Sequence, residues 1–138
     1  MRMTLWGLVA LTALACEPLV TSWEERTEFA IDEAADLDEA APASELKVMT
    51  WNVKYGGGRI NFWFDYWGER VHMTEAEVAS NMAGIYKLIN EVQPDVILTQ
   101  EIDRNSKRTA YFDMVQGILD HTALNYAAYT PVWRARYV

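Results

Sequence analysis

The amino-acid sequence predicts a mixed α/β fold that contains a pair of parallel strands. Two strand-like apolar segments, residues 45–53 and 95–101, flank an amphipathic helix that begins at Thr74. This order is typical of a βαβ unit, whose crossover makes the two strands parallel. The chain can also build a core, since 51% of its 138 residues are hydrophobic, with six tryptophans, seven tyrosines and four phenylalanines. A wholly disordered chain is therefore excluded.

Composition excludes several other classes of protein. No uncharged apolar run approaches the roughly 20 residues that cross a bilayer, so a polytopic membrane protein is excluded. The single cysteine, Cys16, allows neither an internal disulfide nor a zinc site built on thiolates. The net charge of −8 lies entirely in residues 1–45, whereas residues 46–138 carry ten acids and ten bases. Overall charge therefore argues neither for nor against an anionic substrate.

The first 45 residues have the pattern of an export signal followed by a tether. Residues 1–15 join an N-terminal arginine to a short apolar stretch, which predicts a secretory signal peptide. Thr-Ala-Leu-Ala-Cys at residues 12–16 fits both an ordinary cleavage site and a permissive bacterial lipobox. The position of the sole cysteine favours lipidation of Cys16, and hence a lipoprotein of the bacterial cell envelope rather than a freely secreted protein. Residues 16–45, rich in acids and alanine, predict a flexible, solvated tether.

The elements of the βαβ unit each have their own pattern. Residues 45–53 are mostly apolar and are expected to form a strand buried on both faces, and residues 95–101 a second buried strand. Thr74 opens the helix, with Glu77 at the spacing of a capping box. The helix carries one apolar stripe with steps of three and four residues: Val78, Met82, Ile85, Ile89 and Val92.

Three further segments are expected around this unit. Glycines 56–58 break the first strand and lead into an aromatic loop, residues 62–67. A polar, basic loop at residues 103–108 leads to a second helix. The buried face of that helix is expected to consist of Tyr111, Met114, Val115, Ile118 and Leu119. Residues 125–132 are expected to form a third strand.

Asn52 and Glu101 stand at the carboxyl ends of the two predicted parallel strands. Ligand sites in parallel sheets gather at those ends, so these side chains are expected to lie close together. Mg²⁺ takes one or two carboxylates and keeps several waters, and a neutral amide can hold a phosphate oxygen. Alternatively, Asn52 forms a turn, and Glu101 pairs with one of the nearby bases: Arg104, Lys107 or Arg108.

Two segments carry a resemblance to a known family. LKVMTWNV at residues 46–53 and PDVILTQE at residues 94–101, with a helix between them, resemble the opening of the endonuclease/exonuclease/phosphatase superfamily, which has the deoxyribonuclease I-like fold. The resemblance implies that residues 46–138 are the N-terminal half of a four-layered α/β sandwich. By position, Glu101 matches the family's metal-ligand glutamate and Asn52 its active-site asparagine, with Gln100 in support.

The resemblance also implies an activity, a cofactor and a class of substrate. The activity is the metal-dependent hydrolysis of phosphate esters, in which water attacks phosphorus beside Mg²⁺, or Mn²⁺ or Ca²⁺ in its place. The substrate is a nucleic acid, a phospholipid head group or a small phosphoester.

Several features depart from the family pattern. The Asp-x-Asn and Ser-Asp-His motifs of the second half are absent, because residues 103–105 stand too close to Glu101 to be the former. His72 and His121 lie outside a Ser-Asp-His context and are expected at the surface, so no general base is identified. We therefore expect the 138-residue chain to be a fragment without hydrolase activity of its own.

The aromatic loop, residues 62–67, allows several interpretations. It can fold over the sheet as a small core, form a hydrophobic wall beside the substrate, face a membrane, or stack on bases. Arg59, just before the loop, is a candidate substrate-binding residue because a guanidinium can bind phosphate.

The leading hypothesis is an exported, lipid-anchored phosphoesterase, here as its N-terminal part. A rival hypothesis is a non-catalytic surface lipoprotein that uses the same fold as a binding module. A third is an unrelated α/β domain, which a structure with Asn52 and Glu101 pointing apart would favour. No protein partner is predicted.

Overall fold

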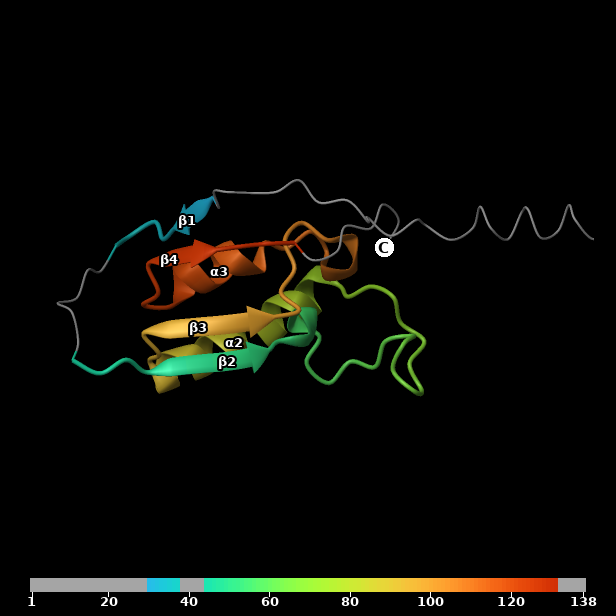
Figure 1. Ribbon diagram of the computed structural model, residues 1–138. Helices are drawn as coiled ribbons and strands as arrows, with labels where there is room; N and C mark the ends of the chain where they lie inside the picture. Colours follow the sequence, from blue (N-terminus) through green and yellow to red (C-terminus); the bar gives the residue numbers. More distant parts are fainter. Residues whose placement is uncertain (1–29, 38–43, 132–138) are drawn as a thin grey trace, which may run out of the picture. The chain divides into compact units, whose positions relative to one another are not determined.

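The computed structural model describes residues 30–37 and 44–131 (Figure 1). The predicted signal peptide, residues 1–15, and the predicted lipidation site, Cys16, lie outside the described residues. Within these residues, two α-helices and four strands form, which confirms the predicted mixed α/β class. The elements are, in order, β1 (Ile31–Glu33), β2 (Val48–Asn52), the 3₁₀ turn η1 (Lys54–Gly56), α2 (Glu75–Val92), β3 (Val96–Gln100), the 3₁₀ turn η2 (Lys107–Thr109), α3 (Met114–His121) and β4 (Tyr126–Ala128).

Strands β2 and β3 pair in parallel, as the sequence predicts. Their register places Val48 opposite Val96 and Asn52 opposite Gln100, so the two strands end together. Figure 1 shows the two arrows side by side with α2 behind them. Trp51 of β2 and Ile97 of β3 pack against the hydrophobic core cluster, which contains all five buried residues of α2. The unit therefore aligns the two polar strand ends at one edge.

The prediction that the first strand is buried on both faces is wrong. Alternate residues of β2 and β3 are exposed, including Val48 and Leu98. Helix α2 covers one face of this two-stranded sheet, and no described element covers the other. An apolar run cannot distinguish these cases, because the packing partners of each face come from elsewhere in the chain.

Helix α2 forms where the sequence predicts it. The Thr74 hydroxyl accepts a hydrogen bond from the Glu77 backbone N–H, and the Glu77 carboxylate accepts one from the Thr74 N–H, so the capping box is complete. Of the predicted stripe, four members are buried, namely Val78, Met82, Ile85 and Ile89. Val92 is half-buried near the C-terminal end, and Tyr86 joins the buried face.

Helix α3 confirms most of its predicted face. Met114, Val115, Ile118 and Leu119 are buried, but Tyr111 is exposed. Asp113 caps the helix by accepting a hydrogen bond from the Gln116 N–H, so the helix begins at Met114. Tyr111 precedes that cap in a left-handed conformation, with φ at 60°, and does not share the helical periodicity.

Part of the predicted tether is structured, which corrects the prediction of a solvated segment for residues 30–37. Strand β1 pairs antiparallel with β4, which lies within the predicted third strand at residues 125–132. Asp32 of β1 accepts a hydrogen bond from the Arg104 guanidinium at 2.7 Å, and Ala34 is buried. An acid-rich segment can join a fold when a distant strand edge and a distant cation match it, which composition alone does not reveal. No helix of the described residues has the length and hydropathy of a membrane span.

The Arg70–Glu77 pair predicts a pH dependence of stability. Two hydrogen bonds from the Arg70 guanidinium, with those from Thr74, lower the pKa of Glu77 from 4.5 to about 2. A carboxyl with a depressed pKa stabilises the fold fully above its ordinary pKa, and this contribution is lost as the pH falls from 4.5 to about 2. We expect Glu77→Gln and Arg70→Gln each to flatten the acid slope of the unfolding free energy. Urea denaturation at a series of pH values measures the slope of the unfolding free energy against pH. A slope that is unchanged in both variants would contradict the prediction.

Candidate functional site

The two residues singled out at the strand ends are in direct contact. The Asn52 Nδ2 atom donates a hydrogen bond to Glu101 Oε1 at 2.9 Å, and both residues are exposed. The Asn52 Oδ1 atom also accepts the Lys54 backbone N–H at 2.9 Å. The turn-forming role and the pairing role of Asn52 are therefore fulfilled together. The two side chains point toward each other. An arrangement in which they point apart, which would favour an unrelated α/β domain, is therefore not observed.

Unusual backbone conformations surround this contact. Lys54, Tyr55 and Glu101 are left-handed, with φ of 46°, 40° and 54°. Side chains alternate between faces along β3, and the left-handed residue at Glu101 ends that alternation, so its carboxylate can reach Asn52. Such conformations cost about 1–3 kcal/mol each and cluster at functional sites. Two backbone bonds hold them here, from the Val53 N–H to Gln100 and from the Tyr55 N–H to Glu101.

The arginines near Glu101 bind other carboxylates. Arg108 binds Asp103 through two hydrogen bonds, and Arg104 binds Asp32 and Asp113. Within the described residues, Glu101 forms no ion pair, so the alternative that one of the three nearby bases pairs with it is not found. Its Oε2 atom accepts no hydrogen bond from a described residue and is available to a ligand.

The Asp103-Arg104-Asn105 sequence has a structural role. Asp103 is buried and engaged by Arg108, and its backbone carbonyl accepts the Met114 N–H at the start of α3. The Arg104 guanidinium bridges Asp32 of β1 and Asp113, the cap of α3. These contacts agree with the expectation that the triplet is not a ligand motif.

Tyr55 and Arg108 lie beside the contact, and the sequence reasoning did not identify either as a site residue. The Arg108 guanidinium lies 3.9 Å from the centre of the buried Tyr55 ring. Burial raises the pKa of Tyr55 to about 12, and the nearby Glu101 and Asp103 add to this against the opposing effect of Arg108. Burial, the largest single effect, lowers the pKa of Arg108. The hydrogen bonds to Asp103 and the charge interactions with Asp103, Tyr55 and Glu101 together outweigh burial and raise this pKa. Tyr55 follows the end of β2 by three residues, which is the one local signal that could have pointed to it.

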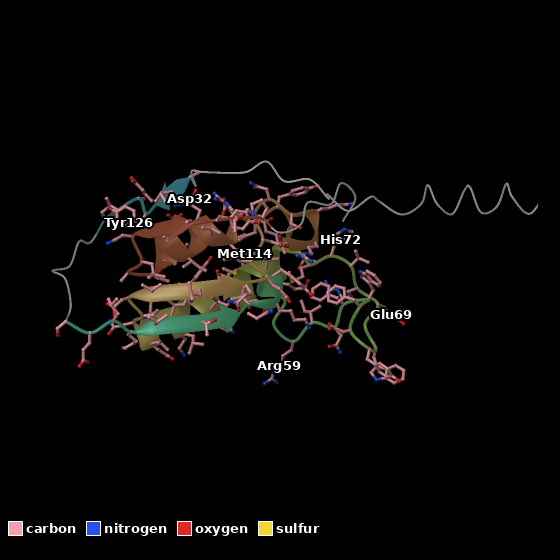
Figure 2. The ribbon with its side chains drawn as sticks, in the orientation of Figure 1. Asp32, Arg59, Glu69, His72, Met114 and Tyr126 are labelled. Carbon is pink, nitrogen blue, oxygen red and sulfur yellow. The ribbon has the colours of Figure 1, made fainter. Side chains whose placement is uncertain are left out.

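The remaining predicted residues do not converge on the site. Arg59 is exposed, forms no hydrogen bond or ion pair with another described residue, and points outward in Figure 2. His72 and His121 are exposed, as expected, and the His121 ring stacks on Tyr86 of α2. Among residues 30–37 and 44–131, no three His, Cys, Asp or Glu side chains gather into a metal-binding group.

The described residues fit a hard cation only in part. Glu101 supplies one carboxylate, and the Asn52 amide beside it holds that carboxylate in place. Mg²⁺ is often held by one or two carboxylates, with water and substrate phosphate completing its coordination, so this donor set is compatible with Mg²⁺ but does not enclose it. Glu101 and Asn52 are the residues that would contact such an ion and its substrate. Comparisons of the chain with protein-family models, with curated proteins and with solved structures found no match.

Proposed function

We propose that this chain supplies Asn52 and Glu101 to the active site of a metal-dependent phosphoesterase. The enzyme would be of the endonuclease/exonuclease/phosphatase type, with the four-layered α/β sandwich of that family. The observation that carries the proposal is the 2.9 Å hydrogen bond between the two side chains at the carboxyl ends of parallel strands. The left-handed Glu101 and the absence of a base paired with it, among the described residues, support it further.

Each residue has a defined task in this proposal. Glu101 contributes negative charge through its free Oε2 atom, and Asn52 fixes the rotamer of that carboxylate. The Asn52 amide has a second N–H, which can donate to a phosphoryl oxygen without adding a charge. A bound Mg²⁺ would stabilise the charge that develops on the phosphoryl and leaving oxygens. Tyr55 and Arg108 form an adjacent wall that holds the turn after β2 in place.

The 138-residue chain itself allows a test of the metal part of the proposal. Mn²⁺ broadens NMR signals of nuclei close to it, so titration with Mn²⁺ should broaden the Asn52 side-chain amide and the Glu101 backbone amide first. Glu101→Gln should remove this selectivity, and Glu91→Gln, which changes an exposed carboxylate on α2, should leave it unchanged. Broadening that Glu101→Gln does not alter would contradict the assignment of Glu101.

The catalytic part is tested on the whole gene product. If its coding sequence contains Asp-x-Asn and Ser-Asp-His motifs, we expect Mg²⁺-dependent hydrolysis of bis(p-nitrophenyl) phosphate, measured as kcat. Asn52→Ala is then expected to lower kcat by about 10²–10³-fold, the effect typical of losing one oxyanion donor. Selective Mn²⁺ binding without hydrolysis would instead favour the binding-module hypothesis.

A further inference from the structure

Four of the five aromatic rings in the loop at residues 62–67 are exposed to solvent. Tyr66 and Trp67 are 87% and 83% exposed, and Trp63 is 62% exposed. The Tyr66 and Trp67 rings contact each other edge to face, with centroids 4.6 Å apart. The prediction that the loop folds over as a small core holds for Phe62 alone, which is fully buried. Large apolar side chains exposed together within one short loop are characteristic of an interaction surface.

The loop is held in this shape by specific contacts. The Asp65 carboxylate accepts hydrogen bonds from the Phe62 N–H and from the Lys54 ammonium, at 2.8 and 2.9 Å. The Trp63 N–H donates to the Arg70 carbonyl, and the Gly68 N–H donates to the Asp65 carbonyl. A Cβ atom at Gly68 would overlap the Phe62 carbonyl, so the turn requires glycine. The outward position of the rings is therefore built into the backbone.

The charges around the loop distinguish between partners. Asp65 is paired with Lys54 and Arg70 with Glu77, and the exposed Arg59 and Glu69 carry one positive and one negative charge. Surfaces that bind single-stranded nucleic acid combine stacking rings with a positively charged groove, and no such excess of positive charge surrounds this loop. Tryptophan and tyrosine with little net charge are favoured at the interface of a bilayer, where the rings meet lipid and their polar atoms meet water.

We propose that the aromatic loop is a membrane contact, with Trp63, Phe64, Tyr66 and Trp67 entering the head-group region of a phospholipid bilayer. The predicted lipid anchor at Cys16 would place the chain at such a surface, independently of the loop. Figure 1 shows the loop beyond the carboxyl ends of β2 and β3, and Asn52 is the last residue of β2. Lys54, two residues after Asn52, binds Asp65 of the loop, so the contact would place the bilayer on the side of the candidate site. The contact does not depend on the proposed hydrolase chemistry.

A label at the outer end of the loop tests the proposal in the full chain. Glu69, which Figure 2 shows at that end, is exposed and forms no hydrogen bond or ion pair with another described residue. Because Cys16 is the only cysteine, the double variant Cys16→Ser, Glu69→Cys carries an environment-sensitive fluorophore at one place. The matched control, Cys16→Ser, Ala83→Cys, carries it on the exposed side of α2.

With phosphatidylcholine vesicles, we expect the label at 69 to shift to the blue and to lose accessibility to iodide several-fold, while the label at 83 does not change. The predicted apolar leader can itself hold the chain on vesicles, but it does not decide which face touches them. Adding Tyr66→Ser and Trp67→Ser should abolish the response at 69, and circular dichroism should be unchanged because both side chains are exposed. Equal accessibility of the two labels would overturn the proposal. So would protection at 69 by oligodeoxythymidine alone, or by raised protein concentration without vesicles.

Discussion

Replacing Phe62 with alanine is expected to lower the free energy of unfolding by about 3–5 kcal/mol. Phe62 is fully buried, meets the Tyr55 ring edge to face at 5.3 Å and stacks on Phe64 at 5.7 Å. The Lys54 ammonium also lies 5.8 Å from its ring centre. Alanine would leave a cavity at the base of the aromatic loop that the rigid turn around Asp65 cannot fill. Since domains of this size have only about 5–15 kcal/mol of stability, the loss is large.

Urea denaturation of the two proteins measures this loss. Phe64→Ala is the matched control, because Phe64 belongs to the same stack but is half exposed. Its replacement is expected to cost less than about 1.5 kcal/mol, the lower end of the range for burying a large apolar side chain. Equal losses in the two variants would show that Phe62 does not anchor the loop in the way described.

Replacing Asp103 with asparagine is expected to lower the free energy of unfolding by about 2–3 kcal/mol. Asp103 receives two hydrogen bonds from Arg108, and both side chains are largely buried. Without the carboxylate, the Arg108 guanidinium retains the Tyr55 ring as a neighbour but loses its counter-ion. The expected loss is below the roughly 3–5 kcal/mol of fully buried pairs, because some contact with water persists.

A double variant separates two effects of Asp103→Asn, the loss of the ion pair and the presence of an unpaired Arg108 guanidinium. Asp103→Asn with Arg108→Met removes the unpaired cation and is expected to recover more than half of the loss, as measured by thermal and urea denaturation. Glu91→Gln breaks the exposed Lys87–Glu91 pair and should change stability by less than about 0.5 kcal/mol. A double variant less stable than Asp103→Asn would mean that Arg108 stabilises the fold mainly through its stacking on Tyr55.

The local elements and the strand-end contact were predictable from sequence. The capping box at Thr74 and the buried stripe of α2 depend on spacings of three and four residues within one helix. The juxtaposition of Asn52 and Glu101 needed one further rule, that parallel strands joined by a helix end at the same edge. Each of these inferences uses either neighbours in the chain or a topological preference that holds for most βαβ units.

Other features depended on partners distant in the sequence. An apolar strand pattern does not tell whether one face or both will be covered, and β2 and β3 have one face exposed. Residues 31–33 became a strand because β4 offers an edge 95 residues further on, where Asp32 pairs with Ala127.

Some features of the candidate site likewise follow from the sequence, and others depend on the tertiary structure. The sequence by itself determined the helix, the two parallel strands and the polar residues at their ends. Only the tertiary structure decided that Arg108 turns to Asp103 and Tyr55, that Glu101 lacks a paired base among the described residues, and that the loop exposes its rings. The physical reason is that periodicity and capping act over a few residues, whereas burial and ion pairing depend on which distant groups share the same space.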